Sequence, residues 1–174
     1  MKLALLFLLS VTVNPAFAGG FGPWTFGMSS EEIQALSTHG PYASFSNGDL
    51  ETYNGEFGGK KENVQFFLNE GRLWRIGVYT YEGTDIEAAT QTWARTYLTL
   101  QQQYGPLETP GYSGATGEAR AKAARALVEG GGKAQMAPMI QPTEEFVFSS
   151  FTSFTSGGAT YYRVTVNYDQ PAVK

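Results

Sequence analysis

Residues 62–82, which read ENVQFFLNEGRLWRIGVYTYE, predict the centre of the fold. Two runs of alternating apolar residues, 62–68 and 72–82, flank a short polar turn at 69–71, and this arrangement is typical of a β-hairpin. Side chains two positions apart lie on the same face of a strand. The hairpin therefore predicts one buried face, which is formed by Val64, Phe66, Leu68, Trp74, Ile76 and Val78.

The opposite face of this hairpin is predicted to carry Phe67, Arg75, Tyr79 and Tyr81. An antiparallel sheet with helices on one side normally has a polar, solvated second face, and these residues are unusual there. Tyrosine and arginine are enriched at the energetic centres of protein interfaces. We therefore predict that these four residues form a binding surface, and the alternative is that a strand, helix or loop covers them.

The longest predicted helix follows this hairpin. Thr84 to Glu87 resembles a capping box, and Gly105-Pro106 is a typical helix end. Between them, apolar residues recur at the helical spacing, which indicates a helix that lies across the sheet. The members of this stripe are Ile86, Ala89, Trp93, Tyr97, Leu100 and Tyr104.

The remaining elements complete an α+β fold in one domain, residues 19–174. We expect an antiparallel sheet of about five to seven strands, with two or three helices packed mainly on one face. A capping box at Ser29–Glu32 begins a helix of two to three turns that ends at Gly40-Pro41. The other predicted elements are strands at 24–28, 42–46 and 50–57, an alanine-rich helix at 118–129, and a final hairpin at 145–152 and 159–169.

The first 18 residues have the pattern of a secretory signal peptide. Lys2 precedes an apolar run, and Ala16-Phe17-Ala18 is an A-x-A cleavage pattern. The chain of 174 residues has a formal net charge of −4, and loss of Lys2 with the leader would make it −5. We expect an exported protein of the bacterial envelope, either periplasmic or extracellular, with no integral membrane segment in the mature chain.

Composition excludes several classes of function. The chain contains no cysteine, so disulfides, thiol catalysis and thiolate metal sites are impossible. Its acidic charge balance argues against a nucleic-acid partner. No zinc, calcium or phosphate-loop motif is present, because Gly130-Gly131-Gly132-Lys133 lacks the Walker spacing. We therefore predict no cofactor and no metal.

Catalytic residues are equally scarce. His39 is the only histidine, and its place at a helix end favours a structural role. Acid–base catalysis by carboxylates needs two groups in unlike environments, and Asp49 and Glu51 are the pair that could share one strand face. We do not expect an enzyme, but a carboxylate-dependent hydrolase stays open as a minor alternative.

The stretch Gly27-Met28-Ser29-Ser30-Glu31-Glu32-Ile33, with the exit at Gly40-Pro41, resembles the opening of small envelope domains of the SmpA/OmlA type and of beta-lactamase-inhibitor-protein-like folds. The resemblance implies an exported α+β module that binds another protein. The chain departs from both groups, because without cysteine it can have neither the lipid anchor of the first nor the disulfides of the second. No functional residue is carried over.

Three hypotheses follow, in order of preference. The first is a non-enzymatic exported module that binds a protein or an envelope component through the aromatic face of the hairpin. The second is a small-ligand carrier with an aromatic-lined pocket between sheet and helix, beside Trp74 and Trp93. The third is the hydrolase that would use Asp49 and Glu51.

Overall fold

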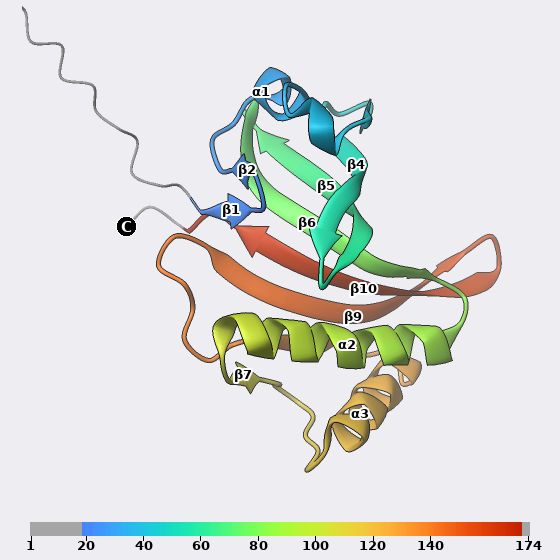
Figure 1. The fold of residues 1–174 in the computed structure, drawn as a ribbon. Helices are drawn as coiled ribbons and strands as arrows, with labels where there is room; N and C mark the ends of the chain where they lie inside the picture. Colours follow the sequence, from blue (N-terminus) through green and yellow to red (C-terminus); the bar gives the residue numbers. More distant parts are fainter. Residues whose placement is uncertain (1–18, 172–174) are drawn as a thin grey trace, which may run out of the picture.

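The computed structural model describes residues 19–171, so the predicted signal peptide lies outside the described residues. The described chain is α+β, with one eight-stranded antiparallel sheet, one two-stranded sheet and three α-helices (Figure 1). The order of strands in the large sheet is β3-β4-β5-β6-β10-β9-β8-β7. These strands are β3 (Tyr42–Ser44), β4 (Leu50–Phe57), β5 (Lys60–Asn69), β6 (Arg72–Gly83), β7 (Leu107–Glu108), β8 (Ala134–Pro138), β9 (Phe146–Ser156) and β10 (Ala159–Asp169).

The large sheet has more strands than the predicted five to seven because its far edge comes from two segments in which no strand was predicted. The short strands β7 and β8 form this edge, and Pro138 ends β8. At the other edge, β3 has only three residues. Short edge strands limit unwanted pairing with other chains. Strands this short show too little alternation to be recognised in the sequence. The predicted strand at 24–28 is reduced to β2 (Trp24–Thr25), which pairs with β1 (Gly20–Phe21).

The hairpin of β5 and β6 confirms the prediction made from residues 62–82. Asn69 pairs with Arg72, and the intervening Glu70 and Gly71 have φ values of 51° and 73°. Two positive φ values in a two-residue loop are the geometry of a type I′ turn, whose twist matches that of the strands. Four of the six predicted core residues of this hairpin are fully buried, and Leu68 is partly buried.

Trp74 is the exception, and its predicted place in the core is wrong. Phe67 pairs with Arg75 and Leu68 pairs with Leu73, so Trp74 is an extra residue in β6, a β-bulge. The extra residue reverses the alternation of faces at this point. Leu73 is therefore buried in the core, whereas Trp74 is 36% exposed.

Two of the three helices match their predicted ranges: α2 (Ile86–Tyr104) and α3 (Gly117–Glu129). The first helix is shorter than the predicted two to three turns. Its capping box at Ser29 and Glu32 is present, but α1 (Ser30–Gln34) has five residues and is followed by a separate 3-10 turn over Ser37–His39. The buried side chain of Ile33 holds this short helix against the sheet, since a helix of this length is unstable alone.

The core lies on one face of the large sheet. Trp93 of α2 is 5.9 Å from Phe151 of β9, measured between ring centroids. Ile33 of α1 and Ala124 and Val128 of α3 belong to the same buried cluster. All three helices therefore cover the same face, as predicted. Within residues 19–171, no helix has both the length and the apolar character that crossing a membrane would require.

We expect Asp85→Ala to lower the free energy of unfolding by about 1 kcal/mol, because Asp85 is the N-cap of α2. Its carboxylate accepts hydrogen bonds from the backbone N–H groups of Glu87 and Ala88, at 2.8 and 3.2 Å. Asp85→Asn keeps an accepting oxygen, so its free energy of unfolding should fall clearly less. Urea denaturation measures the free energy of unfolding of both variants, and equal decreases would contradict the capping role.

Candidate binding face

We call the face of the large sheet opposite the helices the open face. Within residues 19–171 it carries no helix, because every helix contributes to the core cluster on the other side. Three of the four predicted binding residues lie on it. Phe67 of β5 and Arg75 of β6 are direct cross-strand partners, and Tyr79 of β6 pairs with Asn63 on one side and Thr165 on the other. All three side chains are half-buried and reach solvent.

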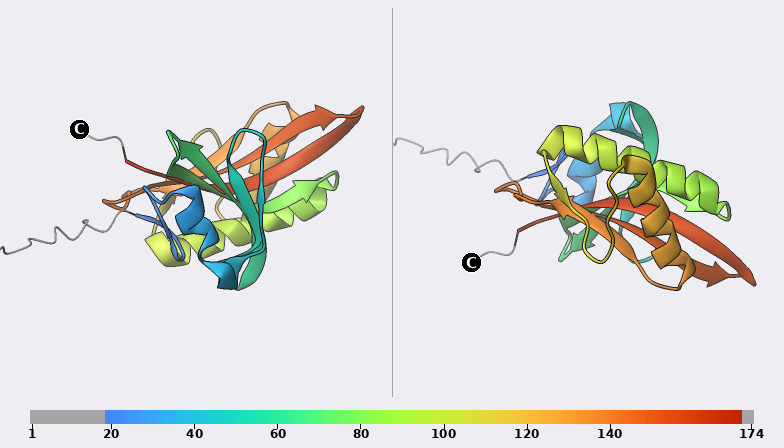
Figure 2. Two further views of the ribbon diagram at one scale, coloured as in Figure 1. Left: turned by 90° about the horizontal axis from the view of Figure 1, so that it is seen from above. Right: turned by 90° about the horizontal axis from the view of Figure 1, so that it is seen from below.

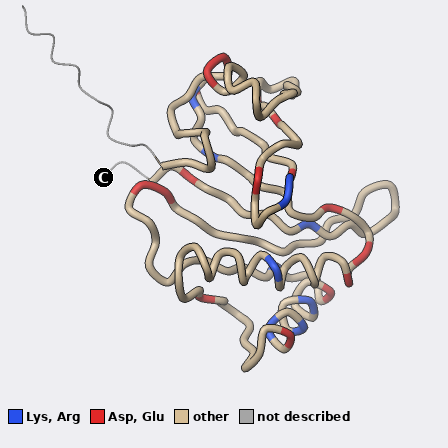
Figure 3. Tube along the Cα trace, in the orientation of Figure 1, with Lys and Arg blue, Asp and Glu red and all other residues tan. Residues whose placement is uncertain are grey.

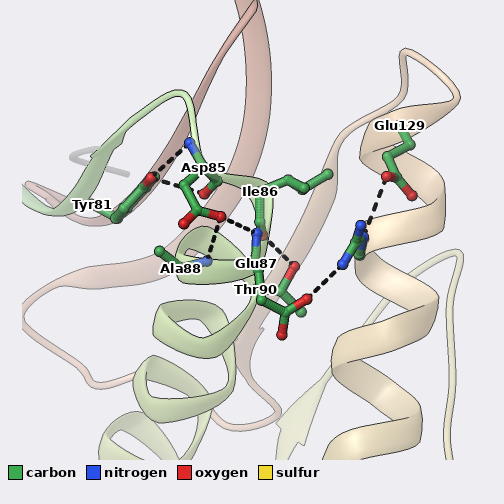
Figure 4. A network of polar contacts seen from close by, with 8 residues as sticks. Tyr81, Asp85, Ile86, Glu87, Ala88, Thr90 and Glu129 are labelled. Carbon is green, nitrogen blue, oxygen red and sulfur yellow. Dashed lines mark hydrogen bonds and ion pairs between the residues drawn. The ribbon is translucent and has the colours of Figure 1, made fainter.

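Tyr81 does not lie on the open face, so its predicted place there is wrong. Val164 pairs with Tyr81 and Thr165 pairs with Tyr79, which makes Thr80 a second extra residue in β6. Tyr81 is thereby turned to the helix side, where it packs against the core. Its hydroxyl donates to the carbonyl of Asp85 at 2.8 Å and accepts from the Asp85 N–H at 3.1 Å (Figure 4). Tyr81 therefore fixes the start of α2.

The surface continues from Tyr79 onto the final hairpin of β9 and β10. The guanidinium of Arg163 lies 5.4 Å from the ring centroid of Tyr79 and 4.5 Å from that of Phe154. Phe154 in turn stacks on Tyr161, with ring centroids 5.5 Å apart and an interplanar angle of 18°. We call these residues the aromatic–arginine row: Arg75, Phe67, Tyr79, Arg163, Phe154 and Tyr161.

Gly77 keeps the row continuous between Phe67 and Tyr79. A Cβ atom at Gly77 would lie 3.2 Å from Cε2 of Phe67 and 3.3 Å from Cε2 of Tyr79. Both rings therefore lean over this glycine, and a side chain there would push them apart. At the other end of the row, the β9–β10 hairpin carrying Phe154 and Tyr161 projects beyond the rest of the molecule (Figure 2).

Both arginines of the row are held by carboxylates on neighbouring strands. Arg75 forms a bidentate pair with Asp169, with Nε–Oδ1 and Nη2–Oδ2 distances of 2.6 Å. Arg163 Nε donates to Glu82 Oε2 at 2.6 Å. The charges are thus balanced within the surface, and few other charged residues lie along the central strands (Figure 3). Such pairing orients the guanidinium groups: that of Arg75 lies 4.6 Å from the ring centroid of Trp74, and that of Arg163 lies against Tyr79 and Phe154.

Burial raises the pKa of the Tyr79 phenol above its ordinary value, and the guanidinium of Arg163 opposes this shift. The Asp169 carboxylate raises the pKa of Arg75 through their hydrogen bonds. Both groups therefore keep their usual charge states near neutral pH. The surface presents a neutral phenol between two charged guanidinium groups.

The carboxylates proposed for catalysis are engaged in structural hydrogen bonds. Asp49 accepts from the Leu68 N–H at 2.8 Å and from Asn47 at 2.7 Å, and Glu51 accepts from Asn63 at 2.9 Å. His39 packs edge-on against Trp24, with ring centroids 5.1 Å apart. Among residues 19–171, no cluster of three or more His, Asp or Glu side chains could hold a metal ion.

An apolar groove lies between α2 and α3, on the helix side of the molecule. Its volume is about 400 Å³, and its walls include Trp93, Tyr97, Leu98 and Ala121. This groove differs from the pocket predicted between sheet and helix beside Trp74 and Trp93, because it lies between two helices. Trp74 is not part of it; this residue lies instead beside Asn47, Asp49 and Phe67.

No family model matches the sequence, and neither a curated protein nor a solved structure matches it significantly. The resemblance to SmpA/OmlA-type domains therefore stays a prediction.

Sequence reasoning missed the half of the row on the last two strands. Tyr161 and Arg163 are two positions apart and therefore share one face of their strand, so a local signal existed. It could not show that β10 pairs with β6, which brings Arg163 next to Tyr79. The partner of a strand depends on the whole topology, and no local pattern encodes it.

We expect Arg163→Gln to raise the pKa of Tyr79 further, because it removes the positive charge that opposes the effect of burial. NMR titration of ring-labelled tyrosine measures this, with Tyr79→Phe to assign the signal. Arg72→Gln is the matched control, because Arg72 pairs with Glu32 at the far end of β6. An unchanged or lowered pKa in Arg163→Gln would contradict the stacked geometry.

The shift also has a consequence for stability. The folded-state pKa of Tyr79 lies above the unfolded value of about 10, so its contribution to stability is complete below that pH. This contribution is lost as the pH rises through the folded-state pKa.

Proposed function

We propose that the protein is a non-enzymatic binding module, exported to the bacterial envelope, that holds a protein or an envelope component on its open face. The observation that carries the proposal is the aromatic–arginine row, on a sheet face that carries no helix in the part of the chain the structure describes. Export rests on the signal-peptide pattern of residues 1–18. The hydrolase hypothesis gains no support, because Asp49 and Glu51 accept hydrogen bonds from residues of the neighbouring strand β5.

The chemistry of the row suits recognition of a polar protein surface that lacks strong charge. Tyrosine and phenylalanine supply large contact areas with two rotatable side-chain bonds each, and arginine is enriched at protein interfaces. Their stacking and ion pairs fix the side chains before a partner arrives, which reduces the entropy lost on binding. The arginine charges are already neutralised by Asp169 and Glu82, so a strongly anionic partner such as nucleic acid gains little here.

A second candidate function is that of a small-ligand carrier, and the groove between α2 and α3 favours it. Its volume of about 400 Å³ and its apolar walls are typical of small-molecule sites. The groove lies on the face of the protein opposite the row. The two candidate functions can therefore be tested by separate substitutions.

The first candidate predicts a partner that depends on the row. A photo-reactive phenylalanine analogue placed at Phe154 should cross-link a reproducible protein or glycan in the envelope of the native host. Tyr79→Ala should weaken the binding of that partner roughly tenfold or more, as expected for a central interface residue.

The matched control is the same analogue at Leu98, which is 61% exposed but lies on the helix side. A partner cross-linked equally from both positions, or one that binds Tyr79→Ala unchanged, would overturn the proposal. Circular dichroism would confirm that each variant is folded.

A further inference from the structure

The groove between α2 and α3 has an apolar floor and one charged end. Ala94 and Tyr97 of α2 and Ala121 of α3 line the groove, and the exposed side chain of Leu98 lies at its rim. The end near the start of α2 is closed by Arg125, which pairs with Glu87 at 2.7 Å and with Glu129 at 3.3 Å (Figure 4). The opposite end, at the start of α3, is therefore the place where a polar ligand group can enter.

This open end has an excess of positive charge. Arg120 lies over the Tyr97 ring at 4.2 Å and donates to the Gly114 carbonyl at 3.3 Å. Among the described residues, neither Arg120 nor Lys122 forms an ion pair with a carboxylate, and the one carboxylate nearby is that of Glu118. The positive end of the α3 dipole adds to the attraction for an anion.

We propose that this groove binds a single-chain anionic amphiphile, a free carboxylate with an alkyl tail. The tail lies on Ala94, Tyr97 and Leu98, and the carboxylate lies at Arg120 and Lys122. A chain without a charged group would lose the attraction of the cationic end, and a dianion would meet Glu118. The proposal rests on the second candidate function and names its ligand class.

The test uses 11-bromoundecanoate, whose bromine quenches only tryptophans that it contacts. The Trp74→Phe variant removes the exposed tryptophan, and Trp24 stays buried elsewhere in the core, so the tryptophan that reports on the groove is Trp93. We expect saturable quenching of Trp93 fluorescence below the concentration at which the amphiphile forms micelles. Leu98→Asp should abolish it, and Arg120→Gln and Lys122→Gln should each weaken it about tenfold, as expected for loss of a charge-assisted contact.

Two controls match these substitutions outside the groove. Ile140→Asp introduces the same charge at a residue that is 85% exposed, and Lys133→Gln removes a cation beyond the end of α3. Neither should change the quenching. Equal loss in these controls and in the groove variants would overturn the proposal.

A neutral probe tests the anionic ligand class independently of the carrier function. We expect 11-bromoundecanol to bind more weakly than 11-bromoundecanoate, and we expect Arg120→Gln to leave the binding of the alcohol unchanged. Equal affinity for the alcohol and the carboxylate would overturn the anionic class while leaving a carrier. Absence of quenching by both probes would overturn the proposal together with the second candidate function.

Discussion

The register of β6 against its two neighbours determines which aromatic side chains the protein buries and which it exposes. β6 has one extra residue opposite β5, Trp74, and another opposite β10, Thr80. Because strand side chains alternate with a period of two, each extra residue reverses the faces beyond it. Leu73 is therefore in the core, and Tyr81 reaches the start of α2. Between the two bulges, Arg75 and Tyr79 stay on the open face.

The Thr80 bulge also ties the sheet to the helix layer. The Thr80 hydroxyl donates to the Val164 carbonyl at 3.2 Å and lies 3.5 Å from the hydroxyl of Thr96 in α2. One residue later, Tyr81 holds the first turn of α2 through both backbone groups of Asp85. The position of α2 then decides where Trp93 packs, and hence where the groove to α3 opens. Both candidate sites thus depend on the same irregularity in one strand.

Several polar groups of the open face are paired with one another. Ser150 and Thr165 share a hydrogen bond of 2.9 Å, Asn167 donates to Thr165 at 3.3 Å, and Asp169 holds Arg75. Beside them, Tyr161 stacks on Phe154, and the guanidinium of Arg163 lies over Tyr79 and Phe154. A surface of this kind is ordered before it meets a partner, which favours recognition over aggregation.

Local patterns in the sequence predicted much of this architecture but not its irregularities. The turn at 69–71, the stripe of α2 and the cap at Ser29 were enough to place the hairpin and two helix starts. The predicted capping box placed the cap of α2 at Thr84, one residue too early, because the Asp85 carboxylate accepts the bonds from Glu87 and Ala88. The bulges at Trp74 and Thr80 could not be predicted, because they are set by pairing with β5 and β10. The same long-range pairing hid Phe154, Tyr161 and Arg163 from the predicted site.

Side-chain oxidation by hydroxyl radicals, read by mass spectrometry, tests most directly whether the row is free for a partner. Phe66 and Phe151, both fully buried in the core, are internal references for protected rings. We expect Phe67, Tyr79, Phe154 and Tyr161 to be oxidised well above these references in dilute protein. Protection of the four rings to the level of Phe66 and Phe151 would show that something in the free protein covers the face, and would contradict its role as a binding surface.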